Sequence, residues 1–135
     1  MIAIDTSAIV AVFRREREVQ AFLNVVAGST SSRISAVAVM ECSIVIRSLK
    51  TLPPEQSERW LDDFLASSEV TIVPVGLNDL ELARLAHIQY GKGTGHPAQL
   101  NFGDCFSYAL AKALNAPLLY KGEDFAKTDI VSALS

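Results

Sequence analysis

Short apolar runs alternate along the chain with longer segments that have helical periodicity. The expected strands are residues 1–4, 33–35, 70–75 and 116–120. The expected helices are a short one that opens at residues 5–7, followed by 16–27, 37–49, 53–68, 78–90 and 102–115. Because strands and helices alternate throughout, the pattern predicts an α/β fold with a central parallel sheet and helices on both faces.

Individual residues mark where some helices begin. Pro53 and Pro54 open the helix at 53–68, because proline is tolerated in the first turn. Asn78, with Glu81 three residues later, predicts a capping box at the start of the helix at 78–90. Residues 91–97 contain three glycines and a proline and are expected to form a loop.

Length and composition indicate one domain that spans residues 1–135. Half of the 135 residues are apolar, which is enough to form a core without disulfides or a structural metal. Cys42 and Cys105 are far apart and read as packed, reduced thiols, as expected in the cytoplasm. Neither a membrane span nor a signal peptide is expected, since no apolar run is long enough and Asp5 interrupts the first one.

The charge balance is not that of a protein that holds nucleic acid by bulk attraction. Twelve basic and fifteen acidic residues leave a formal charge of −3. A protein with this balance that acts on nucleic acid needs a local source of positive charge, and a divalent cation held by clustered carboxylates is one. Arg14, Arg15 and Arg17 could hold phosphates, or they could simply be solvated.

Four acids stand at positions that suggest such a cluster. Asp5 ends the first strand, and Asp124 follows the last strand after a turn at Gly122. Asp104 lies in the first turn of its helix, whereas Glu41 interrupts an otherwise apolar helix and is costly to bury alone. Carboxylates suit Mg²⁺ or Mn²⁺. Each acid also has a structural reading, as a helix cap, a dipole partner, a buried hydrogen-bonded group or a turn residue.

The ordered set of motifs resembles the PIN-domain family, and within it the VapC-type toxins of bacterial toxin–antitoxin systems. The motifs are Asp5-Thr6-Ser7 after the first strand, the buried Glu41, the stretch from Gly95 to Cys105, and Lys121-Gly122-Glu123-Asp124-Phe125 followed by Thr128-Asp129-Ile130. The resemblance covers the whole chain and implies a three-layer PIN-like fold.

The resemblance also implies an activity. It implies an endoribonuclease that uses Mg²⁺, with Mn²⁺ as a possible substitute, and an acidic quartet of Asp5, Glu41, Asp104 and Asp124. Thr6 and Ser7 would support that centre, and Asp129 is a rival for the fourth place.

The implied partners are RNA, a VapB-like antitoxin protein and a second copy of the chain. An arginine of the antitoxin would enter the acidic cluster. A homodimer is also expected because Trp60, Phe64 and the apolar surface of neighbouring helices exceed what a core of this size encloses.

Three alternatives stay open. A phosphatase of the haloacid dehalogenase type also places an aspartate after its first strand, but it needs a second one where this chain has Ser7. A phosphoacceptor receiver domain would need an aspartate at the end of a middle strand. A non-catalytic binding module with the PIN fold would be expected to have lost an acid, and all four are present.

Overall fold

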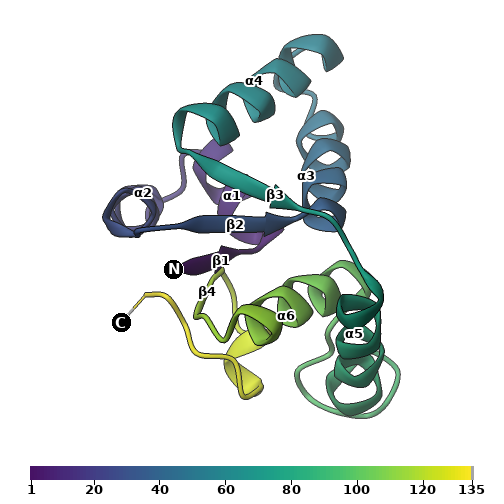
Figure 1. Ribbon diagram of the computed structural model, residues 1–135. Coiled ribbons are helices and arrows are strands. Elements are labelled where there is room, and N and C mark those ends of the chain that lie inside the picture. Colours follow the sequence, from purple (N-terminus) through teal and green to yellow (C-terminus); the bar gives the residue numbers. More distant parts are fainter. Residues whose placement is uncertain (135) are drawn as a thin grey trace.

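The computed structural model describes residues 1–134 and is built on a four-stranded parallel sheet (Figure 1). The strands are β1 (Ile2–Ile4), β2 (Ser32–Ser35), β3 (Val70–Val73) and β4 (Leu118–Leu119), in the order β3-β2-β1-β4. Ile4 of β1 aligns with Ile34 of β2 on one side and with Leu119 of β4 on the other. The predicted parallel sheet is therefore confirmed.

Helices cover both faces of this sheet. They are α1 (Thr6–Phe13), α2 (Val19–Gly28), α3 (Ala36–Ser48), α4 (Pro54–Ser67), α5 (Leu77–Tyr90) and α6 (Phe102–Leu114), with a short 3₁₀ turn at Phe125–Lys127. Helices α1 to α4 lie on one side and α5 and α6 on the other (Figure 1). Successive residues of β1 point to opposite faces of the sheet. Ile2 and Ile4 belong to the first core, beneath α1 to α4, and Ala3 belongs to the second core, beneath α5 and α6. This is why the first strand is a continuous apolar run.

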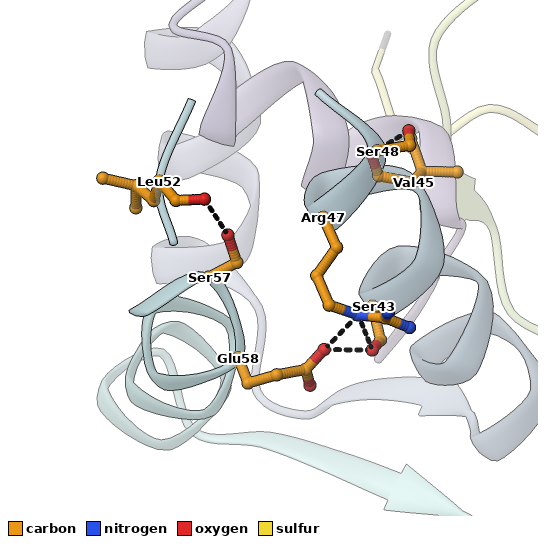
Figure 2. Close-up of polar contacts among 7 residues, drawn as sticks. All are labelled: Ser43, Val45, Arg47, Ser48, Leu52, Ser57 and Glu58. Atoms are coloured by element: carbon orange, nitrogen blue, oxygen red, sulfur yellow. Dashed lines mark hydrogen bonds and ion pairs between the residues drawn. The ribbon is translucent and has the colours of Figure 1, made fainter. Parts of the chain in front are cut away.

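A polar contact joins α3 to α4 at the end of the molecule away from α5 and α6. Ser43 and Arg47 of α3 both donate hydrogen bonds to the Glu58 carboxylate of α4, with 2.9 Å between Arg47 Nε and Glu58 Oε1 (Figure 2). At the start of α4, the Ser57 hydroxyl donates to the Leu52 carbonyl at 3.4 Å. Because both partners of the ion pair are partly exposed, it fixes the angle between the helices more than it adds stability.

The structure corrects several boundaries. Helix α5 begins at Leu77 rather than Asn78, because Asp79 accepts a hydrogen bond from the Gly76 backbone N–H at 2.9 Å and forms the cap. Helix α2 begins at Val19 rather than residue 16, because the chain turns through a positive φ of 55° at Arg15. The strands β3 and β4 are shorter than the apolar runs that predicted them.

The aromatic side chains expected at a dimer surface are used inside the molecule instead. Trp60 stacks on Phe64 with ring centroids 5.3 Å apart, and its edge meets Phe13 of α1 at 4.9 Å. Both residues of α4 are partly buried against the first core. They therefore do not supply the exposed apolar surface that the sequence argument assigned to them. No helix within residues 1–134 is long and apolar enough to cross a membrane.

Candidate active site

A pocket of about 320 Å³ opens at the carboxyl edge of the sheet, where ligands bind in open parallel folds. Three of the four predicted acids line it, namely Asp5, Glu41 and Asp104, and Thr6 and Ser7 line it with them. These residues come from the start of α1, the middle of α3 and the start of α6. The fold thus gathers side chains that are up to a hundred residues apart in the chain.

Asp5 is the most deeply placed of these acids, with 2% of its surface exposed. Its Oδ2 accepts hydrogen bonds from the Ser7 backbone N–H at 2.9 Å and from the Ser7 hydroxyl at 2.6 Å. The Ser7 hydroxyl is fixed in turn by the Lys121 backbone N–H, which donates to it at 3.0 Å. Asp5 is therefore the N-cap of α1, as its structural reading expects, yet its Oδ1 is buried without a hydrogen-bond partner among the described residues. Such an oxygen is costly unless a ligand uses it.

Glu41 points from α3 toward the start of α6. A Cβ atom at Gly103 would lie 2.5 Å from each Glu41 carboxylate oxygen, so a larger residue there would require the Glu41 side chain to move. Burial raises the pKa of Glu41, and the negative charge of Asp5 adds to the shift, while the nearby Thr6 hydroxyl opposes it. The Thr6 hydroxyl itself donates to the Ala38 carbonyl at 3.2 Å, which ties α1 to α3 beneath the site.

Asp104 sits in the first turn of α6 and completes a capping box with Asn101. Its Oδ2 accepts from the Asn101 backbone N–H at 3.0 Å, while its own N–H donates to the Asn101 side chain at 2.9 Å. Burial raises the pKa of Asp104 to about 7; the Asn101 hydrogen bond opposes the rise, and the charges of Asp5, Glu41 and Asp124 add to it. Asp104 therefore lies both at the N-terminal, positive end of the α6 dipole and among the acids of the pocket.

The two candidates for the fourth acid lie in different places. Asp124 is exposed at the start of the 3₁₀ turn and does not line the pocket, although its charge acts on Asp104. Asp129 accepts hydrogen bonds from the Tyr108 hydroxyl at 2.7 Å and from Lys112 at 2.6 Å, which fasten the C-terminal segment to α6. Asp129 therefore has a structural role, and Asp124 remains the better candidate.

Two charged residues of the pocket were not among the predicted site residues. Glu16 and Lys121 both line it, and their side chains pair at 2.9 Å. Lys121 also lies 3.5 Å from Glu18. The sequence motif around Asp124 contains Lys121 but assigns no role to it. No local spacing predicts its pairing with a glutamate more than a hundred residues earlier.

The thiols and the loop histidine do not belong to this centre. Burial raises the pKa of the Cys42 thiol to about 12 and that of Cys105 to about 11, so both stay protonated and are poor metal ligands. His96 accepts a hydrogen bond from the Ala98 backbone N–H at 3.0 Å and meets the Tyr90 ring edge-on. It therefore stabilises its own loop.

The donor chemistry of the pocket fits a hard divalent cation. All of its acidic groups offer oxygen, and the unpartnered Asp5 Oδ1 is the kind of atom that such a cation would satisfy. However, within residues 1–134 no three Asp, Glu, His or Cys side chains converge closely enough to form a ready-made cation site. The carboxylates would have to turn toward a bound ion, as expected for like charges that repel each other without one.

Comparison with known proteins identifies the family of the chain. The family model of the PIN domain matches residues 2–131. "VapC ribonuclease Mb0625" of Mycobacterium bovis and "Ribonuclease VapC28" of Mycobacterium tuberculosis are each 44% identical over 131 residues, which cover 97% of this chain and 96% of theirs.

Solved structures share the fold. Mycobacterium tuberculosis VapC20, described as a sarcin-ricin loop cleaving toxin, has a TM-score of 0.76 at 15% identity over 97% of both chains. A chain of VapBC2 from Rickettsia felis, bound to a promoter DNA fragment, has a TM-score of 0.75 at 19% identity over 98% of this chain and 97% of that one. By the family match and the identity to its relatives, this chain belongs to the PIN-domain family and, within it, to the VapC ribonucleases.

Proposed function

We propose that this chain is a divalent-metal-dependent endoribonuclease and the toxin of a type II toxin–antitoxin system. The observation that carries the proposal is the cluster of Asp5, Glu41 and Asp104 around one pocket, with an Asp5 oxygen that has no hydrogen-bond partner within residues 1–134. Membership of the VapC ribonucleases supports the same activity. Single-stranded RNA, whose bases and backbone are accessible, is the expected substrate class.

Each acid has a distinct part in the proposed reaction. Asp5 and Asp104 would hold Mg²⁺ or Mn²⁺, with Glu41 and Asp124 completing the quartet from α3 and from the turn after β4. When bound, the cation would neutralise the acids, lower the pKa of a water molecule and polarise the scissile phosphate. Ser7 occupies Asp5 Oδ2, which leaves Oδ1, without a hydrogen-bond partner within residues 1–134, to bind the cation. Glu41, whose pKa is raised, would take a proton from the attacking water.

A VapB-like antitoxin is the proposed protein partner. The pocket concentrates carboxylates in a partly desolvated place, where a guanidinium group can pair with two oxygens of one carboxylate. An arginine from the partner would thus occupy the position proposed for the cation. The rest of its peptide would cover neighbouring apolar surface.

A second copy of the chain is the other proposed partner. Large apolar side chains are exposed on α3 and α5 and at the start of α6, among them Met40, Ile44, Leu80, Ile88 and Phe102. Phe102, 74% exposed, borders one hollow with Met40 and Ile44 and another with Leu80, so this apolar surface is continuous across the three helices. It borders Glu41, which would place the two acidic sites of a dimer near a common groove.

Neutralising either central acid should abolish RNA cleavage. Asp5→Asn and Asp104→Asn each remove a negative charge while keeping the side-chain shape, so we expect activity to fall at least about 100-fold with the fold retained. Asp63→Asn, on the exposed side of α4, is the matched control. Cleavage is measured on purified protein with Mg²⁺ and after addition of EDTA. Full activity of either variant, in preparations free of other nucleases, would refute the assignment and favour a non-catalytic binding module.

The raised pKa of Asp104 predicts a pH-dependent stability for the metal-free protein. Folded Asp104 keeps its proton up to about pH 7, whereas an unfolded aspartate loses it near pH 4. The folded state therefore binds more protons in that window, and its stability falls as pH rises. Asp104→Asn escapes this loss, so in EDTA it should be about 1–3 kcal/mol more stable than the parent at about pH 8.

Urea unfolding at several pH values tests this expectation. The advantage of Asp104→Asn should shrink toward about pH 3, where the parent carboxyl is protonated in both states. Asp63→Asn should show no comparable pH-dependent gain. An equal stabilisation at every pH would mean that the variant acts through packing and that Asp104 is not held protonated by the cluster.

The dimer proposal is tested by molecular mass in solution. Light scattering at micromolar concentration should give twice the chain mass of 14.6 kDa. Ile44→Glu places a charge in the apolar surface on α3 and should yield monomers. Val131→Glu changes another exposed apolar residue, near the C-terminus, and should leave the dimer intact. A monomer mass for the parent protein would overturn the proposal.

The antitoxin proposal predicts that one substitution in the partner can abolish inhibition while most of the affinity between the two proteins remains. In the purified complex, alanine in place of the partner arginine nearest Asp5 and Asp104 should restore cleavage while most affinity remains, because apolar contacts hold the rest of the partner. Raising Mg²⁺ should weaken the contribution of the arginine, since both cations use the same carboxylates. Unchanged inhibition, with no partner cation near the acids, would favour steric occlusion instead.

A further inference from the structure

The turn between α1 and α2 carries a dense group of charges beside the acidic pocket. Residues 14–18 read Arg-Arg-Glu-Arg-Glu, so three of the twelve basic residues of the chain fall within four positions. The Arg15 and Glu16 backbone N–H groups donate to the Val12 and Ala11 carbonyls at 3.1 and 3.0 Å. The turn is thus fixed on the end of α1, and it presents Arg14, Arg15 and Arg17 as exposed side chains.

Lys121 holds this turn against the site. Its ammonium group lies 2.9 Å from Glu16 and 3.5 Å from Glu18, and the Glu16 hydrogen bond raises the pKa of Lys121. Lys121 follows β4, and its backbone N–H fixes Ser7, which in turn holds Asp5. Glu16 and Lys121 also line the acidic pocket. The basic turn and the acidic centre are therefore joined through one residue.

The pairing of Lys121 with Glu16 and Glu18 neutralises the acids of the turn and leaves its arginines unpaired within residues 1–134. Arg14, Arg15, Arg17 and Lys121 carry four positive charges, against two negative charges on Glu16 and Glu18, which leaves a formal +2 in a chain of −3. Lys121 occupies both glutamates, and none of the three arginines forms a salt bridge within residues 1–134. Their guanidinium groups are left available to a ligand.

We propose that the Arg14–Glu18 turn, with Lys121 neutralising its two glutamates, binds the backbone phosphates of RNA and guides the strand to the acidic pocket. This inference rests on the proposed ribonuclease function. A pocket lined by carboxylates repels a polyanion, so the strand needs positive charge close by, and this turn supplies it at the border of the pocket. RNA is favoured over an acidic protein segment because the surface leads into the site where a phosphate has to react.

Salt dependence of RNA binding provides the primary test. Binding is measured in the Asp104→Asn background, so that the strand stays intact, with a fluorescent single-stranded oligoribonucleotide across a KCl titration. Each phosphate contact contributes about 0.7 to the slope of log affinity against log salt. Arg14→Gln, Arg15→Gln and Arg17→Gln combined should flatten the slope by about 2 and weaken low-salt binding about 10–100-fold.

Two matched triple variants control for net charge and for side-chain loss. Lys50→Gln, Arg59→Gln and Lys92→Gln remove the same charge from exposed residues that do not line the acidic pocket, and should leave the slope unchanged. Lysine at positions 14, 15 and 17 keeps the charge and should retain most of the slope. If the two glutamine triples behave alike, the turn has no special role and the proposal fails.

The part assigned to Lys121 is tested by rescue. Lys121→Met leaves Glu16 and Glu18 unneutralised and should weaken RNA binding about tenfold or more at low salt. Adding Glu16→Gln and Glu18→Gln should restore that binding, because the repelling charges are gone. A purely structural role of Lys121 would give no rescue, and that result would overturn this part of the proposal.

Cleavage assays separate this inference from the proposed function. In the otherwise unmodified enzyme, the Arg→Gln triple should raise KM with kcat little changed. If the parent cleaves no RNA but the binding results hold, the proposed catalysis fails and the RNA surface stands. If the parent cleaves RNA and the triple keeps its KM and slope, the surface is refuted. Loss of antitoxin binding alone would assign the turn to the protein partner instead, which also refutes it.

Discussion

The structure depends on holding several carboxylates together at one edge of an otherwise apolar sheet. Burial and mutual repulsion favour their protonated forms, which is why the pKa of Asp104 rises to about 7 and that of Glu41 rises as well. The protein opposes this only in part, with two hydrogen bonds from Ser7 to Asp5 and one from Asn101 to Asp104. What the protein leaves unsatisfied, above all Asp5 Oδ1, is what a cation would satisfy.

The parallel sheet is what allows this cluster to exist. Strands β1 and β4 are neighbours that end at the same edge, and α1 and α6 begin there, so that their N-terminal dipoles favour negative charge. Helix α3 brings Glu41 to the same place, where its carboxylate lies against the backbone of Gly103. A methyl group at Gly103 would meet the carboxylate itself. The cluster is thus tied to the backbone of α6 as much as to its own acids.

The sequence predicts those features of the fold and the site that neighbouring residues encode, and it does not predict those that depend on contacts between distant parts of the chain. Strand and helix order follow from apolar periodicity, and Asp5, Asp104 and Glu41 follow from the end of a strand, a first turn and an apolar helix. The start of α5 was misplaced because Asn78 with Glu81 and Gly76 with Asp79 offer the same spacing, and only the fold selects the second. The inward stacking of Trp60 and the pairing of Lys121 with Glu16 depend on elements far apart in the chain, so no spacing predicts them.

Net charge is a poor guide to what this chain binds, because it does not show where the fold places the charged side chains. The formal charge of −3 averages over residues that the fold separates into an acidic pocket and a basic turn at its border. At physiological salt a charge acts over about 8 Å, so a ligand experiences the nearest few side chains rather than the sum. An acidic centre can then hold a cation while the adjacent arginines attract the phosphates that the centre would repel. Lys121 is essential to this separation, because without it Glu16 and Glu18 would extend the negative field into the turn.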